Sequence, residues 1–245
     1  GDKPVYTSLY GGEVVTQVGG PVGLFYGYKT QGVFSTSEDA AFAGLRDGRA
    51  DGDVFRGGDM HFADLVADGV IDEKDKTVIG DPNPDIFGNF GTSLHYKNWT
   101  LNAFFSYSLG NDIYNYQRAV LEGGSTYYNQ TTAVLNRWTS EGQVTEIPRA
   151  ELGDPMGNSR FSDRWIEDGS YLKLKTLSLS YRIPFNYTFL QGITVWAAAN
   201  NVFTCTKYLG SDPELSISSS AVGQGIDRGL LGRGRSFVLG VKINL

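Results

Sequence analysis

One acidic stretch of the chain has the spacing of a calcium-binding loop. Residues 64–75 have the sequence DLVADGVIDEKD. Loops that enclose calcium in oxygen ligands use loop positions 1, 3, 5, 7, 9 and 12, with glycine at position 6 for a sharp turn. Gly69 stands at position 6 here. The calcium ligands that this spacing predicts are Asp64, Asp68, the carbonyl oxygen of Val70, Asp72 and Asp75.

Two residues of this stretch depart from the calcium pattern. Val66 at position 3 has no side-chain oxygen, and Asp75 at position 12 is shorter than the usual glutamate, which binds calcium through both oxygens. Ile71 at position 8 is expected to anchor the loop in a core. The alternative interpretation is a metal-free acidic turn of the same shape. Calcium is therefore the one cofactor that the sequence suggests.

No catalytic set of residues stands out elsewhere. The two histidines, His61 and His95, fall on a loop and a strand without the partners of a Ser–His–Asp arrangement. The single cysteine, Cys205, cannot form an internal disulfide and has no neighbour of a metal or nucleophile pair. The formal charge of −6 argues against nucleic acid, which needs a basic face. We therefore expect neither an enzyme nor a nucleic-acid-binding protein.

The clearest structural pattern is a hairpin that follows the acidic stretch. Two arms, at about 87–96 and 99–109, alternate apolar and polar residues and are joined by two residues. This alternation predicts two β-strands with one apolar face. The expected apolar face carries Phe90, Thr92, Leu94, Tyr96, Trp99, Leu101, Ala103, Phe105, Tyr107 and Leu109. Such strands, with aromatics near the turn, are typical of a membrane β-barrel wall, although a soluble β-sandwich alternates too.

Three further strands are expected, at about 171–183, 193–203 and 235–245. In the first of them the apolar parity changes near Lys175 and Thr176, which indicates either a β-bulge or the point where the strand leaves its apolar surroundings. The last strand places five apolar residues on one face, and a chain that ends in this way is characteristic of outer-membrane barrels. Those five residues are Phe237, Leu239, Val241, Ile243 and Leu245.

The connections between these strands run short, long, short, long. Barrels place short turns in the periplasm and long loops outside the cell, so residues 110–165 and 204–234 are expected to be extracellular loops and Leu245 to be periplasmic. Residues 1–86 would be a further extracellular loop region, with short strands and the calcium-type loop. No apolar run is long enough for a membrane helix.

Two short helices are expected within the loops. Residues 37–45 begin with a Ser cap, early acids and alanines. Ser125 could cap a second helix, whose shared face would hold Tyr127, Thr131, Leu135 and Trp138. The aromatic and arginine side chains of this long loop, Arg149 and Arg160 among them, either contact sugars or peptides or pack the loop against itself.

Several stretches resemble one known family when read in order. These are PVGLFYGYKTQGVF, DGVIDEKDKTVIGDPNPD, FGTSLHYKNWTLNAFFSYSLGNDIYN, RWIEDGSYLKLKTLSLSYRIP, NNVFTCTKYLGSDPE and the last strand. From about Gly19 to Leu245 the chain resembles the C-terminal part of SusC/RagA-type TonB-dependent transporters. The resemblance implies an all-β fold, an antiparallel transmembrane β-barrel, of which this chain holds the last strands and extracellular loops of 22 strands.

The resemblance also implies a function and partners. The family imports large nutrients, oligosaccharides or peptides, across the outer membrane of Gram-negative bacteria. TonB–ExbBD supplies the energy through an N-terminal plug, and a SusD-like surface lipoprotein covers the barrel. The family usually has Asn or Asp at the position of Val66 and commonly ends in Phe where this sequence has Leu245.

Two other interpretations stay open at this point. Five strands cannot close so large a barrel, and the plug and TonB box are missing, so we expect a piece of a longer polypeptide that forms one wall with the remainder of its barrel. A small self-contained outer-membrane barrel would instead need three more strands from residues 1–34. A secreted, calcium-stabilised β domain that binds glycans is the third possibility.

Overall fold

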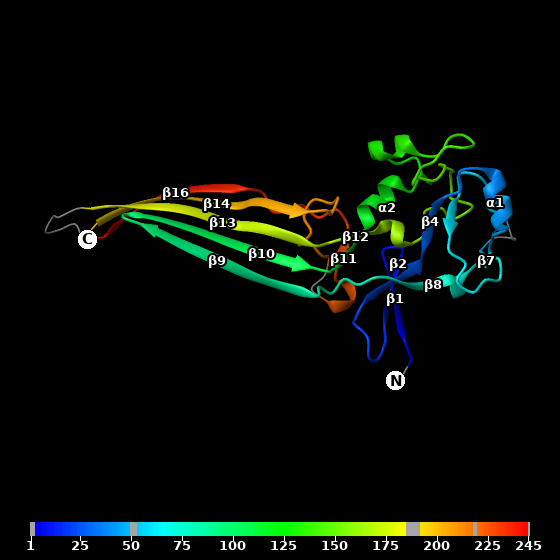
Figure 1. The fold of residues 1–245 in the computed structure, drawn as a ribbon, viewed down its shortest axis with the longest axis horizontal. Helices are drawn as coiled ribbons and strands as arrows, with labels where there is room; N and C mark the ends of the chain where they lie inside the picture. Colours follow the sequence, from blue (N-terminus) through cyan, green and yellow to red (C-terminus); the bar gives the residue numbers. More distant parts are fainter. Residues whose placement is uncertain (1–2, 50–52, 185–191, 218–219, 245) are drawn as a thin grey trace. The chain divides into compact units, whose positions relative to one another are not determined.

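The computed structural model describes residues 3–49, 53–184, 192–217 and 220–244, most of them in β-strands and loops (Figure 1). The chain forms two compact units, which are described separately. The loop unit comprises Gly1–Asn83, Asp112–Glu167 and Leu215–Leu230. The wall unit comprises Pro84–Asn111, Asp168–Glu214 and Leu231–Leu245. None of the helices in the described residues is long and apolar enough to cross a membrane.

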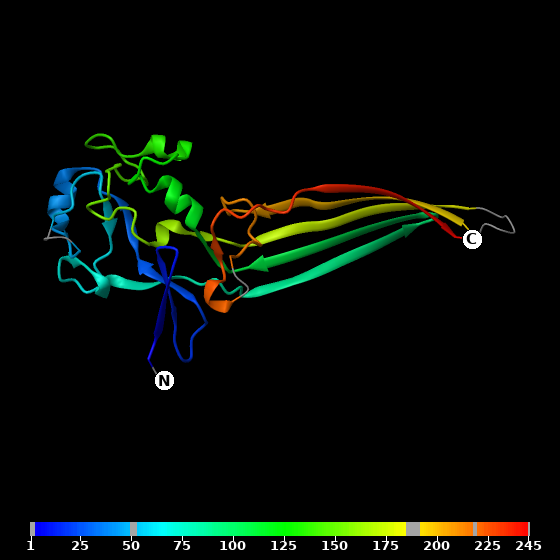
Figure 2. The same ribbon diagram turned by 180° about the vertical axis from the view of Figure 1, so that it is seen from behind.

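The wall unit is one antiparallel sheet of five long strands (Figures 1 and 2). The strands lie in the order β16, β14, β13, β10, β9, so each is paired with its neighbour among the long strands of the chain. Their bounds are β9 Ile86–Tyr96, β10 Trp99–Leu109, β13 Tyr171–Ile183, β14 Gly192–Thr206 and β16 Ser236–Asn244. The hairpin expected from the alternation is confirmed, because Tyr96 pairs with Trp99 across a two-residue turn.

The bulge expected near Lys175 is also confirmed. Leu174 pairs with Phe105 and Thr176 pairs with Phe104, so Lys175 is the extra residue opposite β10. Its other neighbour, β14, is irregular at the same height, where Asn201 has a φ of 51°. The bulge explains why leucines at even and at odd positions of β13 share one face.

The loop unit is built from several small sheets. A four-stranded sheet has the order β1, β2, β3, β8, with bounds Val5–Leu9, Gly12–Thr16, Leu24–Tyr28 and Lys76–Gly80. Three smaller sheets pair β4 Thr30–Val33 with β6 Met60–Phe62, β5 Arg46–Asp47 with β7 Val70–Ile71, and β11 Asp112–Asn115 with β12 Ile166–Asp168 and β15 Ile226–Asp227. The helices are α1 Ser37–Ala43 and α2 Tyr116–Glu122, with 3₁₀ turns at η1 Glu73–Asp75, η2 Thr132–Asn136, η3 Asp163–Trp165 and η4 Ala221–Gly223.

Two apolar clusters hold the loop unit together. The first includes Tyr28, Phe34, Phe55, Phe62 and Ile71. The second includes Val14, Phe25, Tyr114, Trp165 and Ile226, and Trp165 is fully buried. These residues come from all three segments of the unit. The core therefore packs together parts of the chain that are far apart in the sequence.

The helix predictions were partly wrong. Helix α1 exists, but its cap is Thr36, whose hydroxyl accepts a hydrogen bond from the Asp39 amide, rather than Ser37. No helix begins at Ser125. Tyr127 is 89% exposed and the next regular element is the 3₁₀ turn η2, so the expected apolar stripe has no core to pack against.

The helix of this segment begins earlier than the sequence suggested. The Asn115 side chain caps α2 by accepting a hydrogen bond from the Arg118 amide at 3.0 Å. The short connection expected at 185–191, and the terminal residues Gly1 and Leu245, lie outside the described residues.

Candidate membrane-facing wall and acidic loop

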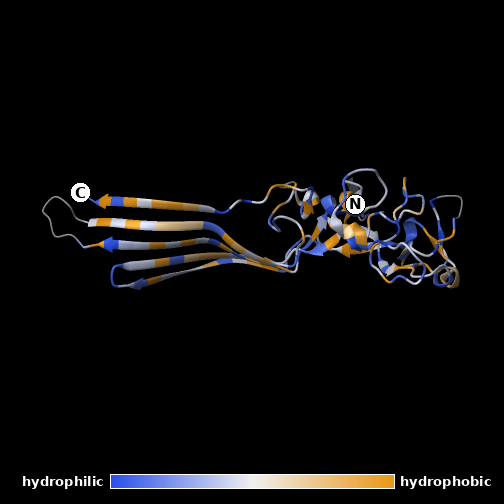
Figure 3. Cartoon of the chain, turned by 90° about the horizontal axis from the view of Figure 1, so that it is seen from above, coloured by the Kyte–Doolittle hydropathy of each residue, from blue (hydrophilic) through white to orange (hydrophobic). Residues whose placement is uncertain are grey.

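The apolar face of the wall unit is exposed. On β16, Phe237 and Leu239 are 81% and 83% exposed, and Val241 and Ile243 are 63% and 57% exposed. These side chains therefore do not lie beneath a second sheet, as they would in a β-sandwich. Apolar residues recur along the strands of this sheet, alternating with polar ones (Figure 3).

The apolar side chains lie in rows that cross the whole sheet. One row joins residues that the register places opposite one another on all five strands, namely Leu94, Leu101, Leu179, Ala197 and Leu239. A neighbouring row, next to the β9–β10 turn, begins with Tyr96, Trp99 and Tyr181. The rings of Trp99 and Tyr181 have centroids 4.6 Å apart. Aromatic side chains of this kind favour the level of lipid head groups.

The opposite face carries a ladder of polar side chains. The His95 ring lies 3.1 Å from the Ser93 hydroxyl and 3.0 Å from the Thr100 hydroxyl, so its partners are hydroxyls rather than a carboxylate. Further along the sheet, Asn102 donates to the Ser178 hydroxyl. This face is suited to water, as the alternation predicted.

A buried ion cluster on the wall unit was missed by sequence reasoning. The ammonium of Lys173 lies 2.8 Å from a carboxylate oxygen of Asp212 and 2.8 Å from one of Glu214, and its side chain is only 3% exposed. Lys175 and the Tyr171 hydroxyl also bind Glu214. Burial alone would raise the pKa of Glu214, but the hydrogen bonds and charges of the two lysines lower it to about 2.

These contacts fasten the segment that follows β14 to β13. The only sequence signal was the coincidence of two lysines in LKLK with two acids in SDPE. Nothing in the alternation indicates that these two stretches meet, since they are brought together by the return of β14 beside β13.

In the acidic loop, the outermost predicted ligands bind backbone amides. Asp64 accepts hydrogen bonds from the amides of Ala67 at 2.7 Å and Gly69 at 2.8 Å. Asp75 is buried, and its two oxygens accept from the amides of Leu65 and Asp72, both at 2.9 Å. The loop thus closes upon its own backbone.

The remaining predicted ligands lie beside a lysine. The Lys74 ammonium is 3.6 Å from Asp68 and 3.2 Å from Asp72, and Asp68 also accepts from the Val70 amide. Among the residues that the structure describes, no group of three or more histidine, cysteine or acidic side chains is placed to hold a metal ion. The donor oxygens are thus held by backbone amides and a lysine, an arrangement that favours the metal-free acidic turn over the calcium cage. Ile71 is fully buried, as expected of an anchor.

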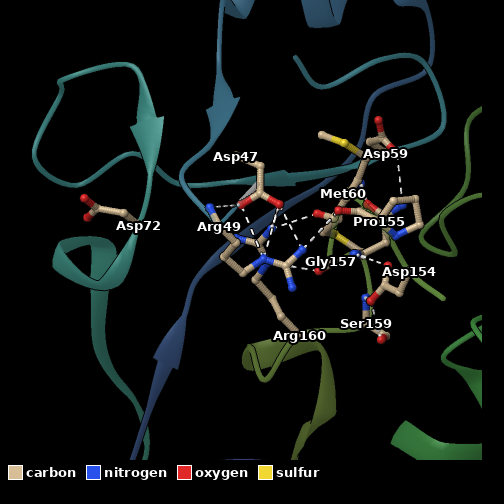
Figure 4. Close-up of polar contacts among 12 residues, drawn as sticks. Asp47, Arg49, Asp59, Met60, Asp72, Asp154, Pro155, Gly157, Ser159 and Arg160 are labelled. Atoms are coloured by element: carbon tan, nitrogen blue, oxygen red, sulfur yellow. Dashed lines mark hydrogen bonds and ion pairs between the residues drawn. The ribbon is translucent and has the colours of Figure 1, made fainter. Parts of the chain in front are cut away.

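The arginines of the long loop bind buried aspartates. Asp47 is fully buried and lies 2.9 Å from Arg49 and 3.1 Å from Arg160 (Figure 4). Burial would raise the pKa of Asp47, but the two guanidinium groups lower it below its ordinary value. The guanidinium of Arg160 also lies over the ring of Phe62, 4.4 Å from its centroid.

A second buried aspartate repeats this arrangement. Asp59 is fully buried, and it accepts hydrogen bonds from Arg149 and from Asn158, each at 2.9 Å. The Asn158 side chain in turn accepts from the Met60 amide at 2.8 Å. Arg149 and Arg160 therefore pack the long loop against residues 1–86, whereas the second interpretation offered by the sequence had the loop packing against itself.

The comparisons with known proteins agree with this geometry. No family model matches the chain. The chain is 34% identical to "TonB-dependent receptor P3" of Formosa agariphila over 94% of its length, and 28% identical to "TonB-dependent receptor SusC" of Bacteroides thetaiotaomicron over 74%. The chain is homologous to TonB-dependent receptors of the SusC type. It spans 23% of the first of these receptors and 17% of the second.

Solved structures show the same fold as this chain. The RagAB peptide transporter matches 98% of the chain with a TM-score of 0.73 at 23% sequence identity. The RagAB peptide importer in an open-open state matches 99% of it with a TM-score of 0.71 at 21% identity. In each case the match covers 24% of the solved chain. The wall unit is accordingly part of an antiparallel transmembrane β-barrel.

Proposed function

We propose that the chain is the C-terminal part of the barrel of a TonB-dependent importer, in the outer membrane of a Gram-negative bacterium. The observation that carries this proposal is the register of the wall unit. Apolar side chains form exposed rows on one face, and the other face carries hydrogen-bonded polar side chains together with a few aromatics such as Phe104 and Trp196. A sheet with lipid on one side and an aqueous lumen on the other needs this arrangement.

The two outer strands of the sheet call for further strands. Within the described residues, β9 pairs only with β10 and β16 only with β14. An open edge would leave backbone N–H and C=O groups without partners in lipid, which costs several kcal/mol for each group. We infer that the remainder of the same barrel pairs with β9 and with β16.

The transported substrate is a large nutrient, an oligosaccharide or a peptide. This inference rests on the names of the relatives, because one is SusC and the solved neighbours are called a peptide importer and transporter. The same names suggest a SusD-like lipoprotein over the barrel. TonB–ExbBD would act through parts of the importer outside this chain. The residues here supply wall and loops, not the energy-coupling machinery.

The orientation follows from the lengths of the connections. The β9–β10 turn has two residues and would lie in the periplasm, whereas the long segments of the loop unit would lie outside the cell.

Labelling of single cysteines in intact cells tests both the location and the orientation. In a Cys205→Ser background, the highly exposed Tyr127 and the turn residue Lys97 would be replaced singly by cysteine. A membrane-impermeant maleimide is expected to label Tyr127→Cys in intact cells, and Lys97→Cys only after the outer membrane is permeabilised. Equal labelling of both in intact cells, or release of the protein by a carbonate wash, would contradict the proposal.

A further inference from the structure

The apolar face of the wall unit contains a hollow over β14. Its volume is about 300 Å³. Two alanines form its floor, and longer apolar side chains stand on both sides. The floor is Ala197 and Ala199, and the flanking side chains are Leu177, Leu179, Phe237 and Leu239.

The hollow exists because small residues lie opposite large ones. Ala197 pairs with Leu179 on β13 and with Leu239 on β16. One row further from the turn, Ala199 pairs with Leu177 and Phe237 in the same way. Two successive alanines between two ridges make a groove that runs along the strand rather than a closed cavity.

The groove begins close to the aromatic row. Tyr181, at the end of that row, pairs with Val195, which is two residues before Ala197 on β14. Because a strand rises about 3.3 Å per residue, the floor of the groove starts roughly 7 Å beyond the aromatic row and extends about 7 Å further. With the aromatic row at the level of the head groups, this interval is the acyl-chain region of the adjacent leaflet.

The lining determines what kind of molecule fits. No charged side chain and no side chain with a hydrogen-bonding group lines the hollow. Phe237 and Leu239 are more than four-fifths exposed, so one wall of the groove is open to the surroundings. A sugar or a peptide would lose its hydrogen bonds to water here without replacement, whereas a hydrocarbon chain loses nothing.

We propose that this groove binds one acyl chain of a phospholipid, whose head group lies beside Tyr96, Trp99 and Tyr181. The inference rests on the proposed function, since the groove meets lipid only if the wall unit lines the outside of a barrel. The groove would hold the acyl chain in one place, whereas the rest of the apolar face offers no such groove. There the residues that correspond to the alanines are larger on most strands, and Leu94 is an example.

Filling the groove tests the proposal. The full-length protein in detergent would be exposed to palmitoyl-oleoyl phosphatidylethanolamine, stripped of excess lipid, and examined by native mass spectrometry. Ala197→Leu and Ala199→Leu put a larger side chain on the floor. Each is expected to lower the retained lipid roughly tenfold, the effect of about two methylene groups losing their contacts. Ala103→Leu is the matched control, because Ala103 lies in the same row as Ala199 but outside the groove.

The possible outcomes separate the proposal from its alternatives. Retention of one lipid by the wild type and by Ala103→Leu, with loss in both groove variants, supports it. Equal retention in all four proteins overturns it, and so does a wild-type dimer that the groove variants convert to a monomer, because the occupant would then be a second copy. A protein that carbonate washes from the membrane fails the proposed function itself, whereas equal retention in a membrane-embedded protein fails only the groove.

Discussion

Replacing Glu214 by glutamine is expected to destabilise the wall unit by about 3 kcal/mol. Partial burial of the carboxylate would raise its pKa, but hydrogen bonds and charges from Lys173 and Lys175 hold the pKa at about 2 against an ordinary value of 4.5. At about 1.36 kcal/mol per pKa unit, this difference corresponds to roughly 3 kcal/mol in favour of the folded, ionised form. Glutamine keeps the shape of the side chain and removes the charge, while the Lys173 ammonium stays buried.

The lowered pKa of Glu214 also determines how the free energy of unfolding should change with pH. A carboxyl whose pKa is lowered by folding stabilises the folded state fully above its unfolded pKa and loses that contribution as the pH falls toward the folded value. The wild type should therefore lose more stability than Glu214→Gln between about pH 5 and pH 2. The assay is the free energy of unfolding of the full-length protein in detergent micelles, measured as a function of pH.

A control variant shows whether the loss of stability depends on the burial of the ion pair or follows from neutralising any paired glutamate. Glu73 also pairs with a lysine, Lys76, but its side chain is 77% exposed, so Glu73→Gln should change stability little. Parallel pH profiles for the wild type and Glu214→Gln would contradict this prediction. A Glu214→Gln variant that is no more destabilised than Glu73→Gln would contradict it as well.

Three further predictions concern the loop unit. Gly58→Ala should cost roughly 3 kcal/mol in a thermal melt, because Gly58 has a φ of +86° and an added Cβ would collide with the Trp138 ring. Asp59→Asn should cost about 3–5 kcal/mol by the same measurement, since it leaves the Arg149 guanidinium without its buried counter-charge. Calcium at 100 times its dissociation constant would stabilise a true calcium cage by about 2.7 kcal/mol. Because backbone amides and Lys74 already bind the aspartate oxygens, we expect calcium titration to leave the melting temperature unchanged.

The wall unit could be predicted from its sequence because its structure is nearly local. Alternation identifies each strand and its apolar face, and the parity change in β13 identifies the bulge at Lys175. Each long strand pairs with the next one in the chain, so a local pattern is enough to fix the neighbours.

The loop unit could not be predicted in the same way. Its strands are short, and β11 pairs in parallel with β15 through Tyr114 and Ile226, residues far apart in the sequence. The contact of Asp47 with Arg160 likewise depends on a long closure of the chain. Periodicity carries no signal for such pairs, because the choice among many distant partners depends on the packing of the finished core.

The bulge at Lys175 sets which charges the wall exposes to hydrocarbon. If the chain lacked that one residue, the period-two rule would turn the segment before it over, and Leu172 and Leu174 would point to the lumen. Lys173, now fixed by Asp212 and Glu214, would then project from the opposite side, toward lipid, and the two carboxylates would lose the ammonium that binds them. Deleting Lys175 would therefore exchange the lipid-facing and lumen-facing side chains of the part of β13 before it, which no single substitution in β13 can do.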